Sequence, residues 1–143
     1  MGLGFGVWGL DRKLYAEVIL DQIRSFKDLR IWQMGMDIVV KVYAHTRGFP
    51  KSEIYGLASQ MQRAAVSIPS NIAEGHNRPN RREFGQFLSI CLGSCAELET
   101  QMLIAKELKF IGDVDCQKLV ELINSEGRQI RVLISKLGQM QKT

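Results

Sequence analysis

Apolar residues recur at steps of three and four along most of this chain, which is the spacing that gathers side chains on one face of an α-helix. Four long segments have this pattern, over about residues 25–47, 52–75, 80–111 and 115–139. No stretch shows a strand-like alternation that outweighs the helical pattern. Four long helices with short connections predict an all-α fold, an antiparallel up-down-up-down four-helix bundle.

Each predicted helix has an apolar stripe that should face the bundle core. The first stripe comprises Leu29, Trp32, Met36, Val39 and Tyr43. The third is a heptad-like seam of Phe84, Leu88, Cys91, Cys95, Leu98, Met102 and Ala105. The last comprises Leu119, Ile123, Ile130, Leu133 and Leu137, with an interruption around Glu126 and Gly127. Such seams are typical of helices that pack against antiparallel neighbours.

The second predicted helix contains a proline, although its helical pattern continues unbroken. Its stripe comprises Ile54, Leu57, Met61, Ala64, Ile68 and Ile72. Pro69 lies within this stripe, removes one backbone donor and clashes with the carbonyl of Ala65, which costs about 3 kcal/mol in a helix interior. Because the pattern stays in phase on both sides of Pro69, one kinked helix is predicted rather than two helices.

Residues 1–24 differ from the rest of the chain and are predicted to form an N-terminal extension to a bundle domain over residues 25–143. Glycines crowd the first nine residues, which is unfavourable for a regular element. Helical spacing begins after Asp11, in the apolar residues Leu14, Tyr15, Val18, Ile19 and Ile23. The extension is therefore expected either to form a short amphipathic helix or to be disordered.

Composition places the chain among ordinary globular proteins. Of its 143 residues 45% are hydrophobic and 24% charged, a balance that indicates neither disorder nor a membrane class. No apolar run approaches the ~20 residues of a membrane span, and the first residues lack a basic leader. Cys91, Cys95 and Cys116 are too few for a disulfide framework. A cytoplasmic protein with reduced thiols and no membrane partner is expected.

The sequence lacks the residue groupings that catalysis or metal binding requires. Glu97 and Glu99 are two residues apart and so point to different faces of a helix. His45 and His76 have no partner at metal-ligand spacing, and the Glu-x-x-His pairs of di-iron bundles are missing. No glycine-rich phosphate loop occurs. We therefore expect no enzymatic activity, no metal and no cofactor.

A mild positive charge is the clearest indication of a partner. The net charge of +4 favours anionic partners, although it is also common in proteins that bind none. The candidate contacts are the basic residues Arg63, Arg78, Arg81, Arg82, Arg128, Arg131 and Lys136. They are interpreted either as a solvated surface that stabilises the helices or as a set of phosphate contacts. Because no aromatic residues interleave for base stacking, such contacts would follow the shape of the nucleic acid.

A dense set of residues in the second and third segments carries a family resemblance. It comprises Tyr55-Gly56-Leu57, Gln60 to Ala65, Ser67-Ile68-Pro69 and Asn71 to Gly75, with further matches at Phe26 to Leu29, Trp32, Phe49-Pro50, Phe84, Phe87-Leu88, Gly93-Ser94, Glu97-Leu98 and Gln101. From about Ser25 to the C terminus, the chain resembles the four-helix-bundle family named after proteins encoded in 23S ribosomal RNA intervening sequences. Residues 1–24 depart from that pattern.

The resemblance implies an up-and-down bundle that assembles as a homo-pentamer, and a similarity to the accessory variability determinant proteins of diversity-generating retroelements. Those relatives use a basic surface to bind nucleic acid and a reverse transcriptase. The leading hypothesis is a non-enzymatic homo-oligomer that binds structured RNA or DNA through the basic residues. The alternative is a protein-interaction scaffold or accessory subunit, for example of a reverse transcriptase, without nucleic-acid binding of its own. The residues assigned to architecture or assembly are Tyr55, Pro69, Asn71, Glu74, Gly75 and Gly93.

Overall fold

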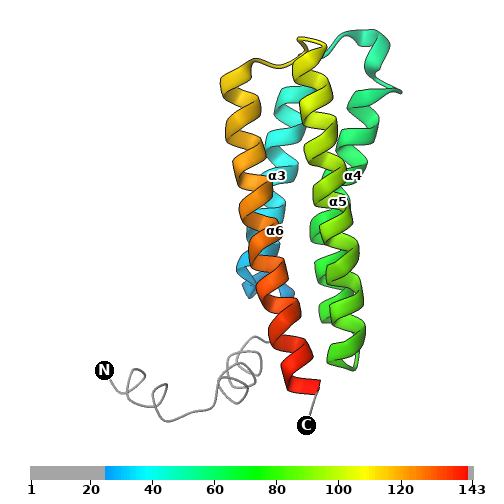
Figure 1. Cartoon of the computed structure of the whole chain (residues 1–143). Helices are drawn as coiled ribbons and strands as arrows, with labels where there is room; N and C mark the ends of the chain where they lie inside the picture. Colours follow the sequence, from blue (N-terminus) through cyan, green and yellow to red (C-terminus); the bar gives the residue numbers. More distant parts are fainter. Residues whose placement is uncertain (1–24, 142–143) are drawn as a thin grey trace.

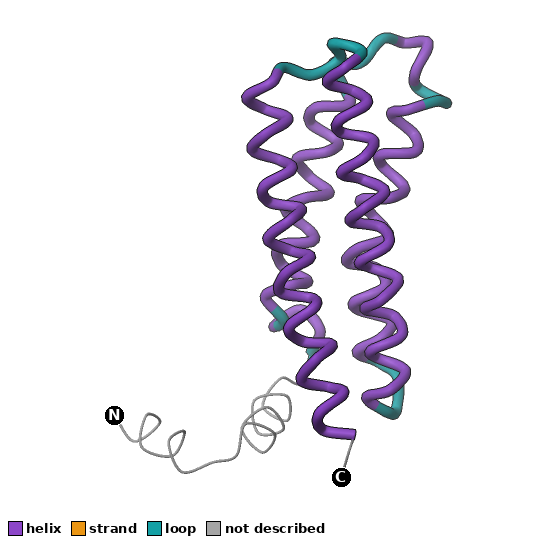
Figure 2. The backbone as a smooth tube through the Cα atoms, viewed as in Figure 1, coloured by secondary structure: helices purple, strands orange, loops and turns teal. Residues whose placement is uncertain are grey.

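The structure, a computed structural model, describes residues 25–141, and the predicted N-terminal extension lies outside them. The described elements are the 3-10 helices η1 (Phe26–Asp28) and η2 (Lys51–Glu53) and the α-helices α3 (Arg30–Thr46), α4 (Leu57–His76), α5 (Arg81–Glu107) and α6 (Asp113–Gln141). No strand occurs among these residues (Figure 2). The all-α, four-helix prediction is therefore confirmed.

The four α-helices lie side by side along one long axis (Figure 1). The colours of Figure 1 trace the chain up α3, down α4, up α5 and down α6, so each connection reverses its direction. The helix α4 packs on both α3 and α5, α5 packs on α6, and α6 returns to α3 with the sparsest contact of these four pairs. Because α3 and α5 are diagonal in this arrangement, their outer faces point to different sides of the bundle.

Aliphatic side chains fill the space between the helices. The largest fully buried ones are Ile38, Val42, Met61, Ile68, Ile72, Leu88, Leu98, Met102, Ile123, Ile130 and Leu137. The whole seam predicted for the third helix is buried in α5, including Cys91 and Cys95, so that prediction is confirmed. Burial stabilises the fold by roughly 1.5–3 kcal/mol for each large side chain.

The first helix buries a different face from the one that the sequence pattern predicted. The buried residues of α3 are Ile31, Gly35, Ile38, Val42 and Thr46. From the predicted stripe, Met36 and Tyr43 are 40% and 38% exposed. The reason is that α3 has apolar residues on most of its sides, so periodicity alone does not decide which side faces the core. Its outer face is left partly apolar.

The predicted helix boundaries also need correction. The second helix begins at Leu57 rather than near residue 52, so Ile54 lies in the preceding turn and is exposed. The third helix ends at Glu107, and Lys109 follows with a left-handed φ of 62°. The predicted start of the third helix is correct, because the Asn80 side chain accepts a hydrogen bond from the Glu83 backbone N–H at 2.9 Å.

Pro69 is buried inside α4, and the helix continues through it to His76. Two residues before it, the Ser67 hydroxyl lies 2.7 Å from the Ser94 hydroxyl of α5. The Asn71 side-chain amide donates to the Ser67 carbonyl at 2.8 Å and to its hydroxyl at 2.9 Å. These hydrogen bonds tie the turn around Pro69 to the neighbouring helix, whereas a bend at Pro69 stays a prediction.

Candidate nucleic-acid interface

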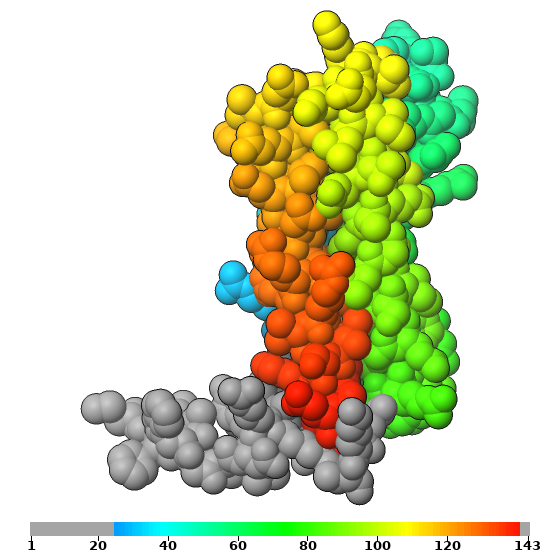
Figure 3. All heavy atoms as spheres, in the orientation of Figure 1, coloured from blue at the N-terminus to red at the C-terminus, as the bar shows by residue number. Residues whose placement is uncertain are grey.

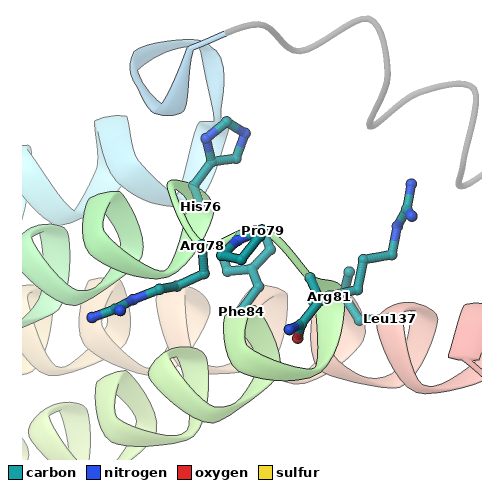
Figure 4. Close-up of a pocket in the computed structure, with 7 residues that line it drawn as sticks. His76, Arg78, Pro79, Arg81, Phe84 and Leu137 are labelled. Atoms are coloured by element: carbon teal, nitrogen blue, oxygen red, sulfur yellow. The ribbon is translucent and has the colours of Figure 1, made fainter.

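The turn between α4 and α5 surrounds an open cavity of ≈ 220 Å³ (Figure 4). Its lining residues are His76, Arg78, Pro79, Asn80, Arg81, Phe84 and Leu137. Leu137 comes from the last turns of α6, which lie beside the first turns of α5 (Figure 3). Residues from three helices therefore meet at this end of the bundle.

The arginines at this turn do not converge on a single point. Arg78 donates to the Glu74 carboxylate at 3.0 Å, and its guanidinium lies 4.9 Å from the centroid of the Phe87 ring. Figure 4 shows that Arg78 and Arg81 extend in different directions from the turn. Since both members of the Arg78–Glu74 pair are well exposed, the pair contributes less than about 1 kcal/mol. An extended polyanion is therefore a better match to this site than one small anion.

His76 lies beside these arginines but adds little charge at neutral pH. Its ring meets the Phe84 ring edge-on, with 5.7 Å between the two centroids. Burial lowers the pKa of the His76 imidazole below its ordinary value of 6.5. The positive charge of the turn therefore comes from its arginines.

The basic residues of α6 divide between two neighbouring helices. Arg128 and Lys136 line a groove between α6 and the start of α3, where Arg30 adds a third cation. Arg131 instead interacts electrostatically with Cys95 of α5. Burial raises the pKa of the Cys95 thiol to about 12, and the positive charge of Arg131 opposes that rise. The candidate contact residues on α6 are thus spread over two faces.

Both groups nevertheless belong to one end of the bundle, where α3 and α5 begin and α4 and α6 end (Figure 1). The basic residues in this half are Lys27, Arg30, Arg78, Arg81, Arg82, Arg128, Arg131 and Lys136, and the acidic ones are Asp28, Asp37, Glu74 and Glu83. The opposite half is balanced in charge: its basic residues are Lys41, Arg47, Lys51, Arg63, Lys106, Lys109 and Lys118, and its acidic ones are Glu53, Glu97, Glu99, Glu107, Asp113, Asp115, Glu121 and the buried Glu126. The fold therefore concentrates the positive charge of the described residues at one end.

Arg63 is not part of this basic end. It lines a groove between α3 and α4 with Tyr43, Ser59, Gln62, Val66, Ser67, Ser70 and Asn71. Along α4 it is roughly 20 Å from Arg78, given a rise of 1.5 Å per residue. Arg63 is therefore separated from the other candidate contact residues.

The residues predicted to shape the bundle or its assembly occupy different environments. A Cβ atom added to Gly75 would lie 2.6 Å from the Cβ of Phe87, so α4 and α5 approach closely there. A Cβ atom added to Gly93 would meet no other atom within 4 Å. Tyr55, in the turn before α4, is 96% exposed. Gly75 is therefore a packing residue within the subunit, while the assembly roles of Gly93 and Tyr55 stay predictions.

Sequence reasoning missed Glu126, which is fully buried in α6. Neither of its carboxyl oxygens has a hydrogen-bond partner among the described residues. A Cβ added to Gly35 of α3 would lie 3.1 Å from Oε2 of Glu126, and that added atom would also touch Ile68 and Pro69 of α4. Burial raises the pKa of this carboxyl to about 8.

The spacing of the α6 stripe could have identified Glu126. It stands three residues after Ile123 and four before Ile130, so it continues the alternation of four and three that the apolar residues follow. A charged residue at such a position is expected to break the stripe. In the fold it remains in the core.

The other ionisable groups give no indication of a metal site. Residues 25–141 contain no cluster of three or more His, Cys, Asp or Glu side chains that could hold a metal ion. Burial raises the pKa of Cys91, like that of Cys95, to about 12, so both thiols are neutral at physiological pH. The helix α5 is long and apolar enough to cross a membrane by length and composition, a test that core helices of bundles also pass.

Comparison with protein families gives a match over most of the chain. A family model described as 23S rRNA-intervening sequence protein matches residues 27–132. No curated protein matches the sequence. The matched range contains α3, α4 and α5 completely, together with the turns between them and most of α6.

Proposed function

This chain belongs to the 23S rRNA-intervening sequence protein family, and from that premise we propose that it is a non-enzymatic, homo-oligomeric bundle that binds RNA or DNA in the cytoplasm. The observation that carries the proposal is the concentration of arginine and lysine side chains at one end of the bundle. Arginine forms paired hydrogen bonds with phosphate oxygens, and a polyanion can reach side chains that point in different directions. Binding of this kind follows the shape of the phosphate backbone and is weakened by salt.

Charge reversal at the α4–α5 turn tests the interface. The double variant Arg81→Glu with Arg82→Glu should bind structured RNA or DNA at least ~10-fold more weakly and show a shallower salt dependence, because each lost phosphate contact removes about 0.7–0.9 from the log–log slope. It should remain folded, since acidic residues are favourable in the first turn of a helix. Fluorescence anisotropy with a labelled RNA hairpin and a DNA duplex measures both effects.

The matched control places the same change of charge at the other end of the bundle. Lys51→Glu with Lys118→Glu alters two exposed side chains and should leave affinity nearly unchanged once ionic strength is fixed. Equal losses in the two double variants would mean that net charge alone drives binding. Absence of binding by the wild-type protein at low salt would remove the nucleic-acid proposal.

We propose further that the oligomer is a closed ring, a pentamer as the family resemblance implies. A ring requires two different patches on each subunit, because the front of one subunit meets the back of the next. One candidate patch is the exposed apolar group on α3 and α4: Met36, Val40, Tyr43 and Val66. The other is the outer face of α5, where Ile90, Leu103 and Ile104 are exposed around the open position of Gly93. Since α3 and α5 are diagonal, these patches suit a ring.

Single charges in either patch should disrupt such a ring. Val40→Glu and Ile90→Glu should each shift the protein to smaller species, because each places an unpaired carboxylate in an interface core. Native mass spectrometry and sedimentation measure the subunit number, and Val114→Glu, at a 64% exposed position at the start of α6, is the control. An effect of Val40→Glu alone would indicate a two-fold dimer through the α3–α4 patch instead.

The alternative function is a protein-interaction scaffold or accessory subunit, for example of a reverse transcriptase. The exposed apolar residues on α3, α4 and α5 favour it, because surfaces of this kind serve protein partners as well as copies of the same chain. A stable oligomer that binds no nucleic acid at low salt would support this alternative over the leading proposal.

A further inference from the structure

The cavity at the α4–α5 turn combines apolar and hydrogen-bonding walls. Phe84 and Leu137 line it and are only 6% and 1% exposed, so its deeper wall is formed by core side chains. Pro79 adds a further apolar surface from the turn itself. At ≈ 220 Å³ the cavity is smaller than the roughly 300–1,000 Å³ of pockets that hold a drug-sized ligand. Its size is therefore suited to a single small ring system.

Two polar side chains of the cavity have hydrogen-bonding groups to offer a ligand. The side-chain oxygen of Asn80 accepts the Glu83 backbone N–H at 2.9 Å, while its NH₂ group has no hydrogen-bond partner among residues 25–141. Because burial lowers the pKa of His76, its imidazole is neutral at pH 7 and has one donor and one acceptor nitrogen. Side-chain amides form hydrogen bonds with the edges of nucleobases, and aromatic side chains, histidine included, stack on unpaired bases.

The two arginines of the cavity lie on different sides of it. Figure 4 shows Pro79 and Phe84 between Arg78 and Arg81, whose side chains extend away from each other. One small anion could not contact both guanidinium groups. In a nucleic acid, however, the phosphates before and after an extruded nucleotide lie on either side of its base. Each arginine could then bind one phosphate while the base occupies the cavity between them.

We propose that this cavity binds the base of one unpaired nucleotide in a structured RNA or DNA, with the flanking phosphates at Arg78 and Arg81. The inference rests on the proposed nucleic-acid binding and narrows the partner to a helix with an unpaired position, such as a bulge. A base inside a duplex is stacked and paired, so it must be extruded before it can enter a pocket. Extrusion costs least where the base is already unpaired, and selectivity for a bulge follows.

Three hairpins that differ at one position test the base pocket. The first is fully paired, the second has a single bulged adenosine, and the third has an abasic nucleotide at the bulge. The bulged and abasic hairpins have the same number of phosphates, so a difference between them reports the base. At fixed ionic strength, the protein should bind the bulged hairpin about tenfold more tightly than the other two. Fluorescence anisotropy with an RNA set and a DNA set measures the three affinities.

The variant Asn80→Ser tests the cavity from the side of the protein. Serine still caps α5 by accepting the Glu83 N–H, but it lacks the amide group. The preference for the bulged over the abasic hairpin should therefore fall several-fold. Asn77→Ser, which removes the same group from an exposed residue of the turn that does not line the cavity, is the matched control and should keep the full preference.

The possible outcomes separate this inference from the proposed function. Binding of all three hairpins with equal affinity in both sets would overturn the base pocket and leave nucleic-acid binding intact. Equal affinity for the bulged and abasic hairpins, both above the paired one, would show recognition of a bent backbone and would also overturn the pocket. An equal loss of preference in Asn77→Ser and Asn80→Ser would exclude the cavity as the site. Absence of binding to every hairpin would remove the proposed function together with this inference.

Discussion

Replacing Glu126 with glutamine is expected to stabilise the bundle above pH 7 and to flatten the dependence of its stability on pH. In the fold, burial raises the pKa of this carboxyl to about 8 from its ordinary value of 4.5. Between these two values the native state keeps a proton that the unfolded chain releases. The free energy of unfolding therefore falls as pH rises, by about 1.4 kcal/mol per pH unit.

Protonated Glu126 makes a favourable contribution to the free energy of unfolding that is complete below pH 4.5. This contribution is lost progressively as pH rises and is gone above about pH 8. Glutamine has nearly the same shape and does not ionise. At pH 8.5 the variant should therefore be more stable than the wild type by on the order of 4 kcal/mol, whereas at pH 5 the two should be similar.

Neighbouring groups do not account for this profile. The thiols of Cys91 and Cys95, which face Glu126 from α5, titrate near pH 12. From α3, Gly35 lies next to the Glu126 carboxyl, since a Cβ added there would be 3.1 Å from Oε2, and glycine has no side chain that ionises. The difference between variant and wild type should therefore report Glu126 alone.

Urea unfolding followed by circular dichroism at pH 5, 6.5 and 8.5 measures this difference. Glu121→Gln, at an exposed position of the same helix, is the control and should shift stability by no more than about 0.5 kcal/mol. If the wild type and Glu126→Gln keep a constant separation at all three pH values, the carboxyl is hydrated or paired in solution, and the expectation fails.

The second large effect is expected from Gly75→Ala. The new Cβ would lie 2.6 Å from the Cβ of Phe87 and 3.0 Å from Cδ1 of Phe84. The Cβ of Phe87 is fixed to its backbone and cannot rotate away, so α4 and α5 must separate. Overpacking of this kind costs about 1–3 kcal/mol, while alanine regains up to about 1 kcal/mol of helix propensity. A net loss on the order of 1–2 kcal/mol should appear in urea or thermal unfolding.

Gly85→Ala is the matched control for that substitution. Gly85 also lies in a helix, but a Cβ added there would have no atom within 4 Å. Alanine should therefore stabilise the protein at this position by up to about 1 kcal/mol. The two glycine variants should move stability in opposite directions, and a gain in both would show that the helices separate there at no cost.

The sequence predicted the elements whose pattern has a single interpretation. The α5 seam from Phe84 to Ala105 was such a case, because it follows from local spacing alone. The buried face of α3 was not, since Ile31 and Trp32 are both apolar and only packing decides between their sides. Periodicity identifies the buried face of a helix only where the opposite face is polar.

The candidate nucleic-acid interface could also be predicted only in part from the sequence. The basic residues could be named from the sequence, whereas their concentration at one end of the bundle depends on helix direction and length. The place of Arg63 in a groove between α3 and α4 likewise required the fold. Glu126 was missed for a different reason: a carboxylate is normally expected in water, and only its place in the α6 repeat indicated burial.

The uneven closure of the bundle has a consequence for how the chain folds. Close packing connects helices that are consecutive in sequence, above all α4 and α5, whereas the sparse α3–α6 contact joins the two ends of the domain. Loop-closure entropy favours the early formation of contacts between sequence neighbours. The α4–α5 hairpin should therefore form in the folding transition state and the α3–α6 seam only afterwards. In stopped-flow experiments, Gly75→Ala should then slow refolding more than it speeds unfolding.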